Sequence, residues 1–206
     1  MRFIGDLSLE DADILALYGK RAKRILEFGC GGSTQIFSQC NPDRLISIET
    51  SQDWINLTKR RVEKLGGITP DFRPYDFIPM TEEFDLIFVD GIDELRRDFA
   101  LGTWKLLAIG GVMVFHDTRR FRDFQNVAWV AQTYFNELLT INVNARARNN
   151  KSSNMTVMLK KELEPYVNWN HAEGKPITAY TNLSDNDEFF PVGLWNEDLR
   201  QCNSQE

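Results

Sequence analysis

Ile25-Leu-Glu-Phe-Gly-Cys-Gly-Gly-Ser-Thr34 is the most informative stretch of the chain. A short apolar strand, residues 24–28, leads directly into a glycine-rich turn, and residues 35–40 have the composition of a short helix. Gly29 and Gly31 carry no Cβ atom, so the backbone of the turn can approach a ligand closely. The stretch therefore predicts a strand–turn–helix unit whose turn faces a bound molecule.

An acidic residue, Glu49, follows the next predicted strand, residues 44–48, and lies twenty residues after Gly29. In a doubly wound sheet this position places a carboxylate beside the glycine turn, where it can bind two ribose hydroxyls. The ordered set of strand, glycine turn, helix, strand and acid therefore predicts a nucleoside-binding half-site. The alternative is a tight strand–helix turn accompanied by a surface glutamate.

The glycine turn differs from the dinucleotide fingerprint Gly-x-Gly-x-x-Gly, whose third glycine allows close packing of the helix. Thr34 stands at the position of that third glycine. Glu27 lies two residues before the first glycine, where its carboxylate would repel a pyrophosphate but would suit a cationic ligand with an amino group. A nicotinamide-dependent oxidoreductase is therefore the less favoured nucleoside-binding class.

The rest of the chain alternates between predicted helices and predicted strands. The helices are residues 8–22, 52–65 and 94–107 and a run at helical spacing from Phe124 to Leu138; the further strands are residues 84–89, 112–115 and 154–159, with a weaker extended segment at 72–77. Alternation of this kind predicts an α/β fold with a mainly parallel sheet.

Composition narrows the class of protein further. The 206 residues carry a formal net charge of −6 and are 42% hydrophobic, which excludes whole-chain disorder and matches one ordinary domain. No apolar run approaches the roughly 18 residues of a membrane span, and Met1–Glu10 is unlike a signal peptide, so we expect a cytoplasmic protein without membrane contact. The acidic balance disfavours a nucleic-acid partner. Three cysteines at unrelated spacings predict neither a disulfide scaffold nor a zinc ribbon.

Residues 161–206 differ in composition from the part of the chain before them. They are rich in Asn, Asp, Glu, Gly and Pro and contain scattered aromatic residues such as Trp169 and Trp195. We expect residues 1–160 to form the domain and residues 161–206 to form an irregular appendage. We expect the aromatic residues to pack either on the core or on a partner subunit. In the second case the protein would be a homo-oligomer.

Three features within residues 20–160 resemble the class I S-adenosylmethionine-dependent methyltransferases, nearest in pattern to the small-molecule O-methyltransferases. They are the pattern Glu-x-Gly-x-Gly-x-Ser at residues 27–33, the acid after the second strand, and the segment Phe84-Asp-Leu-Ile-Phe-Val-Asp-Gly91. The resemblance implies a Rossmann-like, doubly wound, mostly parallel seven-stranded sheet whose last strand is antiparallel. It also implies S-adenosylmethionine as the cofactor.

The resemblance implies cofactor-binding roles for residues near the carboxyl ends of the strands: Glu27, Gly29 and Gly31 at the methionine end, Ser33 and Thr34 in the helix cap, Glu49 on the ribose hydroxyls, Asp76 and Phe77 beside the adenine, and Asp90 facing both cofactor and substrate. Trp54 could cover the ribose or the adenine. The alternative for Trp54 is a buried position against the sheet.

Asp90 and Asp117 end adjacent predicted strands, so both should face the crevice where ligands bind in open α/β sheets. The catechol-type branch of the family implies that these aspartates could hold Mg²⁺, which would lower the pKa of a substrate hydroxyl. Thr118 replaces the asparagine of that branch. The second mechanism is general-base catalysis by His116 or an aspartate. The alternative for His116 is a core position on the far face of the sheet.

The predicted function is transfer of a methyl group from S-adenosylmethionine to a hydroxyl, or another nucleophile, of a small molecule or glycan. One alternative is a catalytically inactive nucleoside-binding or interaction module on the same scaffold, and a less favoured one is an NAD-dependent oxidoreductase. The basic run Arg119-Arg-Phe-Arg122 could hold an anionic substrate or the carboxylate of the cofactor. A solvated loop is the other interpretation of that run.

Overall fold

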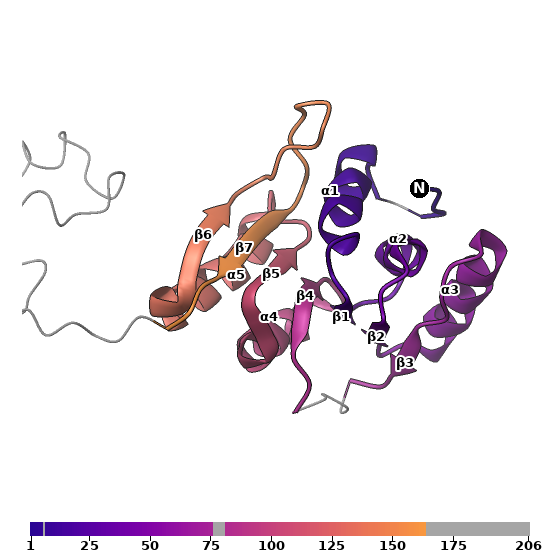
Figure 1. Ribbon diagram of the computed structural model, residues 1–206, viewed down its shortest axis with the longest axis horizontal. Helices are drawn as coiled ribbons and strands as arrows, with labels where there is room; N and C mark the ends of the chain where they lie inside the picture. The colour runs from indigo at the N-terminus through magenta and orange to yellow at the C-terminus, as the bar shows by residue number, and fades with distance from the viewer. Residues whose placement is uncertain (6, 76–80, 164–206) are drawn as a thin grey trace, which may run out of the picture. The chain divides into compact units, whose positions relative to one another are not determined.

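The computed structural model describes residues 1–5, 7–75 and 81–163, which form a seven-stranded sheet with helices on both faces (Figure 1). The helices are α1 (Leu9–Gly19), α2 (Gly32–Cys40), α3 (Gln52–Leu65), α4 (Asp93–Thr103) and α5 (Phe121–Thr133), with 3₁₀ turns η1 (Trp104–Leu106) and η2 (Phe135–Glu137). The strands are β1 (Arg24–Phe28), β2 (Arg44–Ile48), β3 (Asp71–Arg73), β4 (Phe84–Val89), β5 (Leu107–Phe115), β6 (Leu138–Asn142) and β7 (Thr156–Lys160). None of the helices in these ranges is long and apolar enough to cross a bilayer.

The strands are arranged in the order β3-β2-β1-β4-β5-β7-β6. Every neighbouring pair is parallel except the pairs that involve β7, which runs antiparallel to β5 and to β6. This arrangement confirms the predicted doubly wound, mostly parallel sheet with an antiparallel last strand. Val89 of β4 lies opposite Phe28 of β1 and Phe115 of β5, so these three strands end at the same level.

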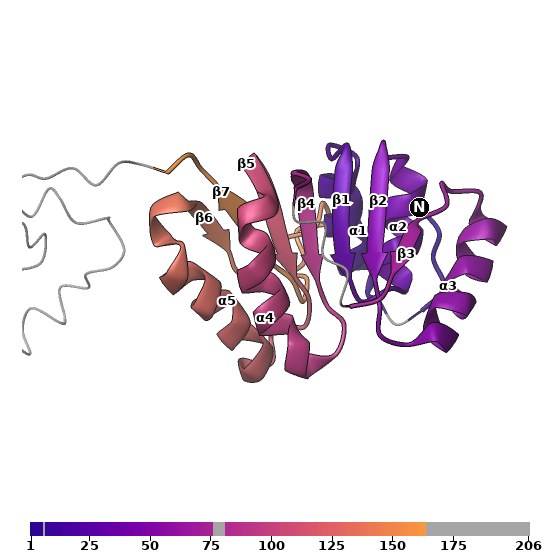
Figure 2. The same ribbon diagram turned by 90° about the horizontal axis from the view of Figure 1, so that it is seen from below.

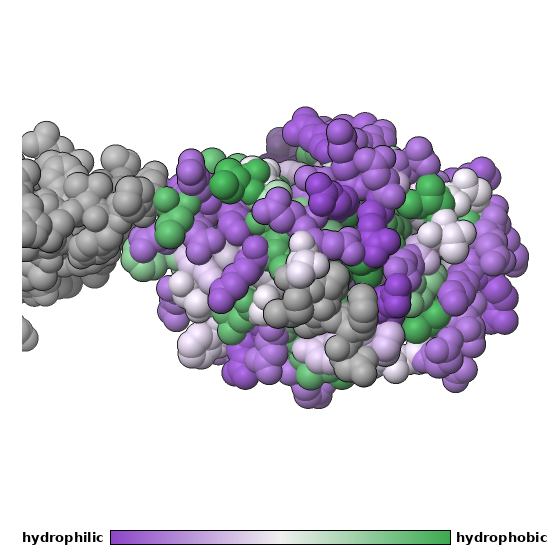
Figure 3. All heavy atoms as spheres, turned by 60° about the horizontal axis from the view of Figure 1, so that its bottom comes forward, coloured by the Kyte–Doolittle hydropathy of each residue, from purple (hydrophilic) through white to green (hydrophobic). Residues whose placement is uncertain are grey.

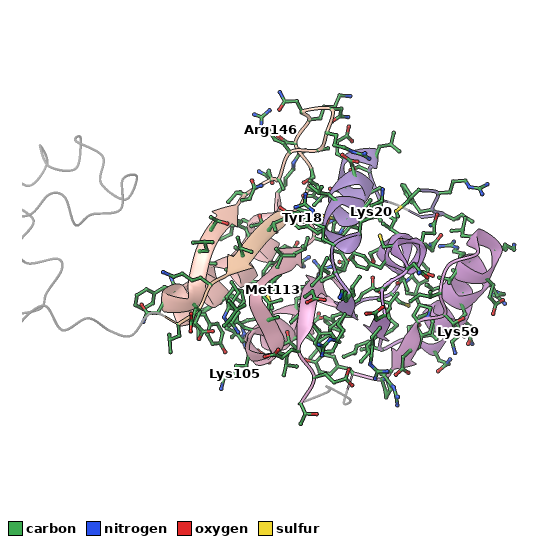
Figure 4. All side chains as sticks on the ribbon, viewed as in Figure 1. Tyr18, Lys20, Lys59, Lys105, Met113 and Arg146 are labelled. Carbon is green, nitrogen blue, oxygen red and sulfur yellow. The ribbon has the colours of Figure 1, made fainter. Side chains whose placement is uncertain are left out.

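Two apolar clusters hold the helices against opposite faces of the sheet (Figure 2). Met113 and Phe115 of β5 lie in the cluster that includes buried residues of α4 and α5, and Figure 4 labels Met113 within the sheet. Val112 and Val114 of the same strand lie in the cluster that includes α1 and α2. This alternation follows from the two-residue repeat of a strand, and it explains why the central strands are almost continuously apolar.

Several predicted elements agree closely with the structure because their ends carry clear signals. Helix α3 has the predicted bounds: the side chain of Ser51 accepts the Trp54 N–H at its start, and Gly66 ends it with a φ of +74°. Strand β4 also has its predicted bounds. Helix α1 is capped by Ser8 as expected but ends at Gly19, three residues before the predicted end.

The predicted helical run from Phe124 to Leu138 is wrong at its C-terminal end. Helix α5 ends at Thr133, Phe135 belongs to η2, and Leu138 begins β6, which pairs with β7. Phe135 and Leu138 are three residues apart, so the spacing of apolar residues matched a helix although the chain had already left it. The predicted strand at 112–115 is also too short, since β5 begins at Leu107.

Candidate functional site

The ends of β1 and β4 approach each other closely at two glycines. Gly29 has a φ of +89° and Gly91 a φ of +61°, both in the region that favours glycine. A Cβ atom on Gly29 would lie 2.1 Å from the backbone nitrogen of Gly91 and 2.6 Å from its Cα. A Cβ atom on Gly31 would meet only Trp54, at an ordinary 3.6 Å. Gly29 is therefore required by the packing of the strand ends, whereas Gly31 leaves space beside the turn.

Glu27 is fully buried beneath the glycine turn. Its carboxylate accepts hydrogen bonds from the hydroxyls of Ser33, Thr34 and Ser47 at 2.5, 2.6 and 2.7 Å. The Thr34 hydroxyl in turn accepts the Gly31 N–H at 2.8 Å. Burial raises the pKa of Glu27 to about 7, and the three hydroxyl hydrogen bonds oppose this effect. Glu27 thus ties the turn to the start of α2; a direct contact with a cofactor stays a prediction.

Glu49 and Trp54 flank the same turn. The Glu49 carboxylate accepts the N–H groups of Cys30, Thr50 and Ser51 at 3.1, 2.7 and 3.0 Å. The indole N–H of Trp54 donates to the carbonyl of Cys30. Trp54 is 42% exposed, so the expectation that it is buried against the sheet is wrong. The structure places Glu49 beside the glycine turn as predicted, and its ribose contact stays a prediction.

A buried arginine, Arg96 of α4, lies among the carboxylates that follow β4 and β5. Its guanidinium is 2.8 Å from Asp90, 3.0 Å from Asp123, 3.5 Å from Asp93 and 3.9 Å from Asp117. It also donates to the carbonyl of Gly91 at 3.0 and 3.1 Å. One delocalised cation therefore neutralises part of the charge of four acids and fixes the backbone after β4.

His116 and Asp117 line the same cavity although they are consecutive residues. Asp117 has a φ of +60°, a left-handed conformation that Asp tolerates better than most residues. His116 packs on the face of the sheet that α1 covers, 3.7 Å from Asp11, whereas Asp117 lies 3.9 Å from Arg96 of α4, yet both side chains reach the cavity. Burial lowers the pKa of His116, but its pairing with Asp11 and Asp90 outweighs burial and raises the pKa to about 10. The raised pKa favours the protonated form of His116.

The donors around Asp90 and Asp117 do not fit a magnesium ion. One atom each of Asp90, His116 and Asp117 lies within 4.8 Å of the others, but Mg²⁺ prefers six oxygen ligands and the donor of His116 is a nitrogen. Both carboxylates are already paired: Asp90 with Arg96 at 2.8 Å, and Asp117 with Arg120 at 2.9 Å. The predicted magnesium site therefore disagrees with the donor set.

A cavity of about 490 Å³ lies beside His116 and Asp117. Its walls come from the start of α1, the segment after β5, and the connection between β6 and β7. That connection lies beside α1 in Figure 1 and is attached to it by the pairing of Arg148 with Asp13. His116 and Asp117, which follow β5, line this cavity, and Nδ1 of His116 lies 3.4 Å from Oδ2 of Asp90, which follows β4.

The structure brings together most of the site residues that the sequence predicts. Gly29, Gly31, Glu49 and Asp90 flank one edge of the sheet, whereas Asp76 and Phe77 lie outside the described residues, as does the predicted appendage from residue 164 onward. Sequence reasoning missed the buried Arg96 and Asp11 and the role of Asn154, whose side-chain amide donates to Asp117 at 2.8 Å. Asp11 and Asn154 lie far from the motifs in the sequence, and Arg96, although it follows the Phe84–Gly91 segment closely, reaches the carboxylates only through the fold.

No family model matches the chain. It is similar to a probable cobalt-precorrin-6B C(15)-methyltransferase (decarboxylating) of Saccharolobus solfataricus, with 29% identity over 104 residues, 46% of this chain and 52% of that protein. The chain thus spans about half the length of this curated relative.

Solved structures resemble the chain over a larger part of its length. The O-methyltransferase TomG from Streptomyces achromogenes, in complex with SAM, has a TM-score of 0.60 at 20% identity and covers 77% of this chain and 83% of its own. The O-methyltransferase from Bacillus cereus, in complex with SAH, has a TM-score of 0.60 at 17% identity over 76% of this chain and 83% of its own. The chain therefore has the class I S-adenosylmethionine-dependent methyltransferase fold.

Proposed function

We propose that the chain is an S-adenosylmethionine-dependent methyltransferase that methylates a hydroxyl of a small molecule without the help of a divalent metal. The observation that carries this proposal is the position of the glycine turn, Glu49 and Asp90 at the ends of adjacent strands in a chain with this fold. The TomG and Bacillus cereus structures, which share the fold, contain SAM and SAH and support the same cofactor.

The chemistry of the donor set fits this cofactor. Gly31 and the half-exposed Trp54 lie side by side at the turn, and the carboxylate of Glu49 offers acceptors for ribose hydroxyls. Asp90 and the other carboxylates at the strand ends suit a positively charged ligand. When bound, S-adenosylmethionine supplies an electrophilic methyl group on a cationic sulfur.

Asp90 is the residue we assign to proton transfer. Its side chain is 28% exposed at the end of β4, and its Oδ2 atom lies 3.4 Å from Nδ1 of His116, which lines the cavity. As the bond between the acceptor oxygen and the methyl carbon forms and the sulfur–carbon bond breaks, Asp90 accepts the hydroxyl proton. The products are a methyl ether and S-adenosylhomocysteine. The raised pKa of His116 favours its protonated form, and its Nδ1 atom faces the Asp90 carboxylate, so we assign it to positioning Asp90 instead of accepting the proton.

Isothermal titration calorimetry of S-adenosylmethionine, S-adenosylhomocysteine and NADH tests the proposed cofactor. We expect the first two to bind and NADH not to bind. Glu49→Ala should weaken binding, whereas Glu63→Ala, an exposed acid on α3, should leave it unchanged. If neither S-adenosylmethionine nor S-adenosylhomocysteine binds, the proposed methyltransferase activity is refuted, and a non-enzymatic role of the same fold is favoured.

The metal-free part of the proposal has its own test. Methyl transfer measured with radiolabelled S-adenosylmethionine should be equal with EDTA and with added Mg²⁺, because the carboxylates are already neutralised by Arg96 and Arg120. Loss of transfer in EDTA with recovery in Mg²⁺ would contradict a metal-free reaction.

A further inference from the structure

The residues that line the cavity beside His116 have polar or charged side chains, which is unusual for a site that binds an aromatic molecule. Every described residue that lines it carries a polar or charged side chain, from Ser8 and Asp11 of the α1 segment to Asn154 before β7. A flat apolar ring would displace water from polar groups that it could not hydrogen-bond. A molecule with many hydroxyl groups would replace the hydrogen bonds of the displaced water with its own.

Most charges around the cavity are paired with one another. Asp11 pairs with His116 at 3.7 Å, Asp117 with Arg120 at 2.9 Å, and Glu10 with Lys151 at 3.9 Å. These pairs leave the lining close to neutral, so they do not by themselves select a charged ligand.

Arg119 is the exception among the charged groups of the lining. Its guanidinium donates to the backbone carbonyl of Ser152 at 2.8 Å, and within the described ranges no carboxylate lies within 4.0 Å of it. Its backbone N–H donates to the side chain of Asn154 at 3.0 Å, which fixes the loop on which it lies. A guanidinium has five N–H donors, so several of them stay available to an anion at the cavity.

We infer that the methyl acceptor is a small polyhydroxylated molecule carrying one anionic group, a carboxylate or a phosphate, that pairs with Arg119. This inference rests on the proposed methyltransferase function and names the substrate class of the same site. The hydroxyl groups bind the polar lining, and the anionic group sets the orientation in which one hydroxyl reaches Asp90. The face shown in Figure 3 has hydrophilic residues over most of its coloured area, with apolar residues in separate small patches.

Four probe molecules separate the two parts of the inference. D-Gluconate and glucose 6-phosphate are anionic polyols that differ in the anion, sorbitol is a neutral polyol, and 3,4-dihydroxybenzoate is an anionic aromatic diol. Binding of each is measured by calorimetry in the presence of saturating S-adenosylhomocysteine. We expect at least one anionic polyol to bind more tightly than both sorbitol and 3,4-dihydroxybenzoate.

Variants at two exposed arginines test the role of the guanidinium. Arg119→Gln should weaken binding of the anionic polyol about tenfold, the effect of losing a charge-assisted hydrogen bond, and Arg119→Lys should weaken it less. Arg146→Gln is the matched control: Arg146 also donates to a backbone carbonyl of the β6–β7 connection, at 3.0 Å to Asn150, but it does not line the cavity (Figure 4). Thermal unfolding confirms that each variant is folded.

Three results would overturn the inference: tighter binding of 3,4-dihydroxybenzoate than of the polyols, unchanged anion binding in Arg119→Gln, or binding of S-adenosylhomocysteine without binding of any probe. In each case the methyltransferase proposal would stand. Failure of S-adenosylhomocysteine itself to bind would instead refute the proposed function and, with it, the acceptor class.

Discussion

Replacing Gly29 by alanine tests how closely the ends of β1 and β4 approach. The added Cβ atom would lie 2.1 Å from the nitrogen of Gly91, 2.6 Å from its Cα and 3.1 Å from the carbonyl carbon of Asp90. Ordinary contacts between non-bonded heavy atoms lie near 3.5 Å, so the backbone of Gly91 would have to move by roughly 1 Å. That backbone carries the carbonyl that Arg96 binds.

The expected loss of stability has two parts. A left-handed residue with a Cβ atom costs about 1–2 kcal/mol, and Gly29 has a φ of +89°. Forcing packed groups apart costs about 1–3 kcal/mol more. We therefore expect Gly29→Ala to lower the free energy of unfolding by about 2–5 kcal/mol, a large fraction of the stability of a typical domain.

Gly66→Ala measures the first part alone, so its difference from Gly29→Ala gives the second. Gly66 has a φ of +74°, but a Cβ atom there would meet nothing within 4 Å, and the same holds for Gly110 at +79°. Both variants should lose only the backbone part, about 1–2 kcal/mol. Urea unfolding of the three variants gives the comparison. Equal losses in Gly29→Ala and Gly66→Ala would refute the argument that the strand ends are in close contact.

Three further predictions concern the buried charges. Burial raises the pKa of Glu27 from 4.5 to about 7, so between these pH values the folded state binds more protons than the unfolded state. The free energy of unfolding should therefore fall by about 3 kcal/mol as the pH rises from 4.5 to 7. Glu27→Gln should remove this pH dependence, which urea unfolding at a series of pH values measures. Because the pKa of His116 is raised from 6.5 to about 10 in the folded state, its contribution to the free energy of unfolding is complete below pH 6.5 and decreases as the pH rises towards 10. His116→Gln should abolish this pH dependence. The same pH dependence in the variant and in the unmodified protein would argue against a protonated His116. Arg96→Met should lower the free energy of unfolding by about 3–5 kcal/mol and make it depend on added Ca²⁺, because the carboxylates around it lose their cation. Arg97→Met, at an exposed arginine, is the control and should show neither effect. Stabilisation of the unmodified protein by divalent ions would contradict a site neutralised by Arg96.

The central part of the fold could be predicted from the sequence because local signals and the global arrangement agree there. Strands β1, β2 and β4 are short apolar runs that end at glycine or acidic residues, and α3 has a serine cap and a terminal glycine. The edge strand β6 gave no comparable signal. Its residues Leu139 and Ile141 are exposed, so no apolar face distinguished it from the preceding helix.

The position of Asp90 could be predicted because it follows a buried strand directly, and the parallel register then fixes its neighbours. His116 could not be placed in this way. The strand repeat predicts that it faces away from Asp117, and the two side chains do contact helices on different faces, yet both reach one cavity at the left-handed backbone of Asp117. Conformations of this kind depend on tertiary contacts, here with Asn154 and Arg120, that lie outside any local pattern.

The convergence of acids at the strand ends explains why this fold needs a buried cation on α4. Carboxylates that suit a cationic cofactor also repel one another when they are removed from water, and an uncompensated buried charge is strongly destabilising. Asp90 and Asp117 come from adjacent strands, and Asp123 is added by the first turn of α5. Arg96 contacts all three and is itself 7% exposed, so its charge is held in place by them in return. Arg96 therefore compensates part of the charge of these acids, and the reactivity that we assign to Asp90 depends on a residue that does not touch the substrate.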